Sequence, residues 1–135
     1  MTEVDDVFSG LQCRTHVWLS QDAIDGIAEY AKKDEFLKKL RYYAEAGFLA
    51  MEGSGRPVRH EGSGVYRVGH DLFRLIGFYE DDTKKDFIGI ATFDKHGQKL
   101  RRNERELIKG IAEIKNGVQW KRKVVPNGQY PRLAQ

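Results

Sequence analysis

The sequence predicts an α+β domain in which an antiparallel β-sheet is covered by an N-terminal helix pair and followed by a C-terminal helix. Three observations lead to this prediction. Apolar residues recur at helical spacing between residues 20 and 48. Strand-like segments rich in β-branched and aromatic residues then follow within residues 65–93. A last amphipathic stretch begins at Leu100, so the expected order of elements is β-α-α-β-β-β-α.

The N-terminal part is expected to form one strand and an αα-hairpin. The first strand is predicted at residues 15–20. Ser20 stands where a helix N-cap belongs, because its hydroxyl can accept a hydrogen bond from an unpaired backbone N–H. The second helix is expected to begin after Asp34, a second capping candidate, and to present an apolar stripe that ends near Phe48. Since few residues separate the two helices, they should pack as an antiparallel pair.

Residues 52–64 are rich in glycine and contain the tetrapeptide Glu-Gly-Ser-Gly twice, around Arg-Pro-Val-Arg-His. Such a density of glycine is typical of phosphate-binding loops. However, no Gly-Lys-Ser/Thr follows and no helix opens directly after it, so a Walker loop is excluded. We expect a mobile connection here that could include a short edge strand at Val58.

Three strands are predicted at residues 65–68, 72–79 and 87–93. Short loops join them, so consecutive strands must be antiparallel, because a parallel pair needs a long crossover. The helix pair should cover one face of this sheet. The opposite face is expected to stay partly open, with the basic segment 95–105 at its rim. The final helix carries Gly110, which weakens it by about 1 kcal/mol relative to alanine.

Length and composition favour a single domain over residues 1–135; the family resemblance described below implies a core at about 15–115 and a basic C-terminal extension at 116–135. No apolar run approaches the roughly 20 residues of a membrane span, and no secretory signal is visible. The lone cysteine, Cys13, fits a reducing, cytoplasmic compartment. No residues have metal-ligand spacing, and the acidic cluster at 80–82 is best explained as solvated turn carboxylates. We therefore expect no metal and no cofactor.

Charge is unevenly distributed along the chain. Residues 1–30 contain six acidic residues and one basic residue, a net charge of −5, whereas residues 95–135 contain eleven basic and three acidic residues, a net charge of +8. This asymmetry points to a polyanionic partner near the C-terminal half, although a solvated face with a basic tail is the commoner explanation of a charge run.

Two arginines interrupt the predicted strands: Arg67 between Tyr66 and Val68, and Arg74 in an apolar strand. Antiparallel pairing could place both guanidiniums on one face, close to a basic run that holds Lys95, Lys99, Arg101 and Arg102. Guanidinium groups match phosphate oxygens bidentately. A single-stranded nucleic acid also offers bases that stack on aromatic side chains such as Tyr66. For any single arginine, a surface side chain that reaches solvent remains the commoner alternative.

Such a patch could also cleave RNA. When a ribose 2′-hydroxyl attacks the neighbouring phosphate, cationic side chains stabilise the charge that develops in the transition state. A histidine can transfer a proton, because its ordinary pKa is about 6.5. His96, within the basic run, and His70, in the turn before the Arg74 strand, are the candidates.

The segments "GVYRV", "LFRLIGFYEDD" and "FIGIATFDKHGQKLRRNERELI" together resemble the RelE/ParE toxin superfamily, nearest to its RelE/HigB-like RNase branch. The features that carry the resemblance are Tyr66-Arg67, Phe73-Arg74, Phe93-Asp94-Lys95-His96 and Gln98-Lys99. The order of elements matches as well, over roughly residues 15–115. A histidine at 96, where the family usually has a second lysine, and the extension at 116–135 depart from the pattern.

The resemblance implies the toxin of a type II toxin–antitoxin system: an endoribonuclease that cleaves mRNA at the ribosome and is neutralised by a cognate antitoxin, expected to be an acidic or helix-turn-helix protein. By position, the family's catalytic roles would fall to Arg67, Arg74, Lys95, His96 and Lys99. Among these, Arg74 would stabilise the phosphate, and Lys95 and His96 would transfer protons. The expected RNA-binding residues are Lys99, Arg101, Arg102, His70, Tyr66, Lys121 and Arg122.

Two other functions remain open from the sequence. One is a ParE-like inhibitor of DNA gyrase without nuclease activity, which the presence of Lys95, His96 and Lys99 disfavours. The other is a non-enzymatic nucleic-acid-binding module that uses the patch for affinity alone.

Overall fold

The structure is a computed structural model that describes residues 2–3, 14–94 and 101–116. The strands are β1 (Thr2–Glu3), β2 (His16–Leu19), β3 (Val58–Gly62), β4 (Val65–His70), β5 (Phe73–Tyr79) and β6 (Asp86–Asp94). The helices are α1 (Gln21–Glu29), α2 (Lys33–Ala46), the short 3-10 helix η2 (Phe48–Met51) and α3 (Arg101–Asn116). The predicted α+β class, with a helix pair before the main strands and one helix after them, is confirmed.

The strands form one sheet in the order β1-β2-β6-β5-β4-β3. From β3 to β6 each strand pairs antiparallel with the next, as their short connections require. β2 pairs parallel with β6, which is possible because the long stretch of chain between them provides the crossover. The glycine-rich segment, expected to be a mobile connection, holds the edge strand β3 suggested at Val58 and the turn that joins it to β4.

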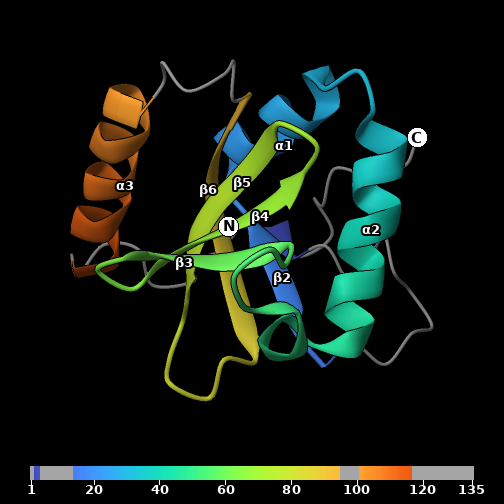
Figure 1. Cartoon of the computed structure of the whole chain (residues 1–135), viewed down its shortest axis with the longest axis horizontal. Coiled ribbons are helices and arrows are strands. Elements are labelled where there is room, and N and C mark those ends of the chain that lie inside the picture. Colours follow the sequence, from blue (N-terminus) through green and yellow to red (C-terminus); the bar gives the residue numbers. More distant parts are fainter. Residues whose placement is uncertain (1, 4–13, 95–100, 117–135) are drawn as a thin grey trace.

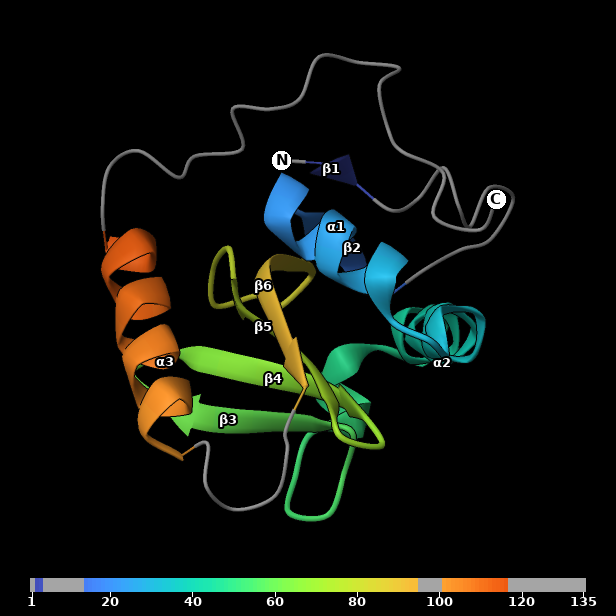
Figure 2. The ribbon, with the colours of Figure 1, turned by 90° about the horizontal axis from the view of Figure 1, so that it is seen from above.

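Helices cover both faces of the sheet. Figures 1 and 2 show α1 and α2 on one side of the sheet and α3 on the other. The larger core lies under α1 and α2 and includes Phe36, Leu75 and Phe87. On the other face, Ile111 of α3 packs in a cluster with the fully buried Phe78. The expectation of a partly open second face is therefore wrong over this region, because the apolar stripe of α3 buries itself there.

The starts of the two N-terminal helices differ from each other. Ser20 caps α1 as predicted, since its Oγ accepts a hydrogen bond from the backbone N–H of Ala23 at 3.1 Å. Asp34 is not a cap: α2 begins at Lys33, and Lys32 occupies the cap position without a side-chain hydrogen bond. Asp34 instead lies in the first turn, where a carboxylate interacts favourably with the helix dipole.

Gly110 lies within α3 with open space around it, because a Cβ built on it meets nothing within 4 Å. We expect Gly110→Ala to raise the free energy of unfolding by about 0.5–1 kcal/mol, since alanine loses less backbone entropy than glycine when a helix forms. Thermal unfolding followed by circular dichroism measures this change. An unchanged or lower melting temperature would contradict the assignment of α3 as a continuous helix at this position.

Candidate anion-binding site

Arg67 and Arg74 lie on the same face of the sheet, on adjacent strands. In the β4–β5 register Arg67 is opposite Ile76, and Gly69 is opposite Arg74. Side chains on one strand alternate between faces, so Arg67 and Arg74 share the face on which Ile76 packs toward α3. The register agrees with the expectation from the sequence that antiparallel pairing could place these two guanidiniums on one face.

The two arginines line a common hollow of about 290 Å³ near the end of the sheet where β5 begins. Its wall is completed by residues of the glycine-rich turn before β3 and of the β4–β5 turn. The lining residues are Gly55, Arg56, Pro57, Arg67, Gly69, Asp71 and Arg74. The hollow thus gathers guanidinium groups from three segments of the chain. Asp71 is its one lining carboxylate, and that side chain forms a 3.0 Å ion pair with Lys32.

Arg74 is held in place by backbone carbonyl groups. Its Nη1 donates to the carbonyl oxygens of Asp71 at 2.6 Å and of Phe73 at 2.9 Å. Its buried Nε has no hydrogen-bond partner among the described residues. Burial, followed by the nearby charge of Arg67, lowers the pKa of Arg74 below its ordinary value. An anion in the hollow would relieve both effects, because it supplies an acceptor and an opposite charge.

Arg67 lies between two glutamates from different elements. Its Nε is 2.7 Å from Glu61 Oε1 on β3, and its Nη1 is 3.9 Å from Glu104 Oε1 in the first turn of α3. The side chains of Arg67 and Glu104 are only 15% and 11% exposed, so this contact fixes the start of α3 beside the hollow. The close contact at Nε leaves the Nη groups of Arg67 as the ones able to bind a ligand.

The basic run follows β6 and leads into α3 in the sequence. Arg74 is the register partner of Phe93, so the C-terminal end of β6 lies next to it. Lys95, His96 and Lys99 fall outside the described residues, as do Lys121 and Arg122. Arg101 and Arg102 form the start of α3, where only their backbone is described.

His70 lies on the opposite face of the sheet from the arginines. Its residue is 7% exposed, and its Nδ1 is 3.0 Å from the Tyr30 hydroxyl. Tyr30 in turn stacks on Phe73, with ring centroids 4.1 Å apart. His70 therefore belongs to the core beneath the helix pair, and the structure does not bring it together with Arg67 and Arg74.

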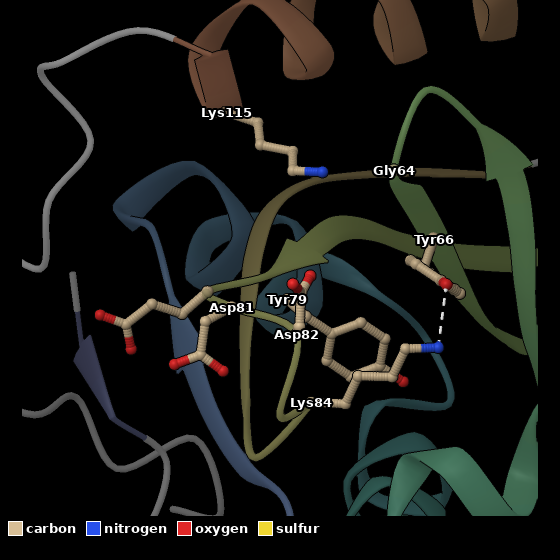
Figure 3. Close-up of a pocket in the computed structure, with 8 residues that line it drawn as sticks. Gly64, Tyr66, Tyr79, Asp81, Asp82, Lys84 and Lys115 are labelled. Carbon is tan, nitrogen blue, oxygen red and sulfur yellow. Dashed lines mark hydrogen bonds between the residues drawn. The ribbon is translucent and has the colours of Figure 1, made fainter.

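Tyr66 also points away from the arginine hollow and lines a second, larger pocket of about 500 Å³. Figure 3 shows Lys84 directed toward the Tyr66 hydroxyl, Lys115 extending from α3 toward the pocket, and Asp81 on the side of the view away from Tyr66. Lys84 Nζ donates to the Tyr66 hydroxyl at 3.2 Å. Because adjacent residues of a strand face opposite ways, Tyr66 and Arg67 cannot contact one ligand within the same hollow.

The floor of this second pocket is a satisfied polar network. Glu52 accepts hydrogen bonds from Tyr79 at 3.1 Å and from Lys84 at 3.3 Å. Burial, reinforced by Glu52, raises the pKa of the Tyr79 hydroxyl far above its ordinary value. Burial opposes the charged form of Lys84, yet its contacts with Tyr66 and Glu52 together raise its pKa. These groups already have hydrogen-bond partners, so we interpret them as fixing the β5–β6 hairpin loop against the sheet and not as an anion-binding site.

Sequence reasoning did not identify four charged residues that belong to the arginine surface. They are Arg56 and Arg59, from the Arg-Pro-Val-Arg segment, and Glu61 and Glu104. A signal for the first two was present: the two Gly-rich tetrapeptides mark turns at either end of a short strand. A strand at residue 58 that pairs with the Tyr66-Arg67 strand places Arg59 beside Arg67.

The part of the chain that the structure describes contains no group of three or more His, Cys, Asp or Glu residues placed to hold a metal ion. Within the same residues, no helix has the length and apolar character needed to cross a lipid bilayer.

The fold and site together define an α+β protein with a cationic hollow at one end of its sheet. No protein-family model matches the chain, and no curated protein matches it. Among solved structures, the chain is similar to one from the toxin–antitoxin complex RelBE2 of Mycobacterium tuberculosis. The two share 16% identity with a TM-score of 0.41, over 62% of this chain and 100% of the other.

Proposed function

We propose that this chain is the toxin of a type II toxin–antitoxin system and acts as a metal-independent endoribonuclease that cleaves mRNA at the ribosome. The observation that carries the proposal is the meeting of Arg67 and Arg74 in one hollow with Arg56. Guanidinium groups from separate segments of the chain are suited to hold a phosphate from several sides, because each presents a fork of N–H donors.

The proposed reaction uses the RNA's own 2′-hydroxyl. The hydroxyl loses its proton and attacks the adjacent phosphorus, and the P–O5′ bond breaks with protonation of the leaving oxygen. The products are a 2′,3′-cyclic phosphate and a 5′-hydroxyl end. Arg74 and Arg67 bind the non-bridging oxygens, whose negative charge increases in the phosphorane-like transition state. The partial burial of Arg74 strengthens this interaction, since less water screens it.

Proton transfer is assigned to Lys95 and His96, and RNA binding to Lys99, Arg101 and Arg102. These assignments are proposals supported by the ends of the segment that contains them. β6 ends at Asp94, one residue after the register partner of Arg74, and α3 begins at Arg101, close to the Glu104–Arg67 contact. The described residues on either side of this segment, Asp94 and Arg101, are therefore both close to the hollow.

An antitoxin is the proposed protein partner, and the cytoplasm is the proposed compartment. The solved structure to which the chain is similar is a toxin–antitoxin complex. The antitoxin in that structure is the partner of the solved protein. For this chain, the basic balance of residues 95–135 favours a partner that contributes acidic side chains.

Controlled expression in bacteria, followed by mapping of transcript 5′ ends, tests the proposed activity. We expect growth arrest together with new mRNA ends inside coding regions, and purified protein with ribosomes should produce 5′-hydroxyl ends paired with 2′,3′-cyclic phosphate ends, the products of attack by the RNA's own 2′-hydroxyl. Growth arrest with intact mRNA and broken DNA would instead identify a gyrase inhibitor. Binding of nucleic acid without any cut would identify a binding module.

A further inference from the structure

Three arginines form a row across three adjacent strands of the sheet. Arg59 on β3 is the direct register partner of Arg67 on β4, so their side chains share one face. Arg74 on β5 lies on the same face, diagonally across from Arg67. Neighbouring strands are about 4.8 Å apart, so the row extends roughly 10 Å from β5 to β3.

This arrangement is unfavourable for the free protein. Like charges placed directly opposite each other on a sheet destabilise the strand pair. Arg67 is compensated by Glu61 and Glu104. Neither Arg56 nor Arg59, by contrast, has an ion-pair partner among the described residues, and both are exposed. Uncompensated positive charge therefore lies both in the hollow, at Arg56, and beyond it, at Arg59, and an extended anion would neutralise both.

The position of β3 allows such an anion to continue past the hollow. Among the described strands β3 is the one at this edge of the sheet, and the Arg59 side chain on it is exposed. Arg56 lies just before β3 and lines the hollow itself. A chain of phosphates that starts at Arg74 can thus cross β4 at Arg67 and leave the sheet over Arg59.

We propose that Arg59 extends the hollow, which Arg56 also lines, into a track for about three consecutive phosphates of single-stranded RNA, one for each strand crossed. The identity of the polyanion rests on the proposed function. Single-stranded RNA is favoured over a duplex because its backbone is free to follow the row from strand to strand. The track binds phosphate only, so it contributes affinity and orientation without base preference.

The test measures binding of fluorescent 2′-O-methyl RNA, which lacks the attacking hydroxyl, at lengths of two, four and eight nucleotides and several salt concentrations. For the eight-nucleotide RNA, Arg59→Ala should weaken binding about tenfold and reduce the slope of log K against log salt by about 0.7. It should leave binding of the two-nucleotide RNA unchanged. Arg59→Lys should retain most of the affinity, because it keeps the charge.

Arg41→Ala provides the matched control, since Arg41 is an exposed arginine of α2, on the other side of the sheet, where it pairs with Glu45 at 3.4 Å. It should bind all three RNAs as the unsubstituted protein does. Thermal melting confirms that each variant is folded. The track is wrong if Arg59→Ala binds the eight-nucleotide RNA with unchanged affinity and slope. It is also wrong if duplex RNA or poly-glutamate binds more tightly than the single strand.

The two proposals fail separately. If the 2′-O-methyl RNAs bind as described but unmodified mRNA stays intact, the track stands and the nuclease function is wrong. If mRNA is cleaved while Arg59→Ala changes neither affinity nor salt slope, the nuclease function stands and the track is wrong.

Discussion

Replacing Arg74 by alanine is expected to lower the rate of mRNA cleavage by about 10²–10³-fold, the usual loss when a group that stabilises transition-state charge is removed. Arg74 is the arginine of the hollow whose position is fixed by two carbonyl groups, at 2.6 and 2.9 Å. It therefore needs little reorganisation when the charge on the phosphate increases. Single-turnover cleavage of a defined mRNA on ribosomes measures the loss.

Two further variants show whether the lower cleavage rate of Arg74→Ala results from the loss of a catalytic group in the hollow. Arg74→Lys should recover part of the rate, because the ammonium keeps the charge but loses the bidentate fork. Arg41→Ala removes the same charge from α2 and should cleave at the unsubstituted rate. Cleavage by Arg74→Ala at that same rate would show that the hollow is not the catalytic site.

Gly77→Ala is expected to lower the free energy of unfolding by about 3 kcal/mol, the upper part of the range for overpacking. A Cβ at Gly77 would lie 1.9 Å from the carbonyl oxygen of Ile88 and 2.9 Å from the Cα of Gly89. These are backbone atoms of β6, which cannot rotate away as a side chain can. The pairing of β5 with β6, at the centre of the sheet, must therefore shift. Thermal unfolding should show a fall in melting temperature of about 10 °C.

Gly110→Ala is the matched control for this second prediction, since it makes the same chemical change where nothing lies within 4 Å. The two substitutions should move the melting temperature in opposite directions. If Gly77→Ala has the same melting temperature as the unsubstituted protein, β5 and β6 do not approach each other as closely at this position as the structure shows.

The sequence predicted elements whose evidence is local. Helical spacing identified α1, α2 and α3, and short connections required the antiparallel order of β4, β5 and β6. Period-two alternation along β5 also puts Arg74, Ile76 and Phe78 on one face, and the burial of Ile76 and Phe78 in one cluster agrees with it. The same alternation could have separated Tyr66 from Arg67, because adjacent strand residues face opposite ways.

Other features depend on contacts between distant segments, which no local pattern encodes. A register shift between Ile76 and Gly77 displaces the β5–β6 pairing by one residue, so that Arg74 lies opposite Phe93 rather than Thr92. Such a shift reverses which face each paired residue occupies. Glu104 reaches Arg67 across 37 positions of the chain, and Arg56 joins the hollow only because β3 pairs with β4.

The sequence by itself determined the three helices and the main antiparallel strands, because periodicity and short loops are local properties. It allowed two arginines of neighbouring strands to share a face but did not set the register. Only the tertiary structure decided that α3 closes the second face, that Tyr66 and His70 lie apart from the arginines, and that Arg56 and Arg59 lie with them. These outcomes follow from how distant segments pack and pair, where the burial of apolar surface and the register of strands are set by the whole chain.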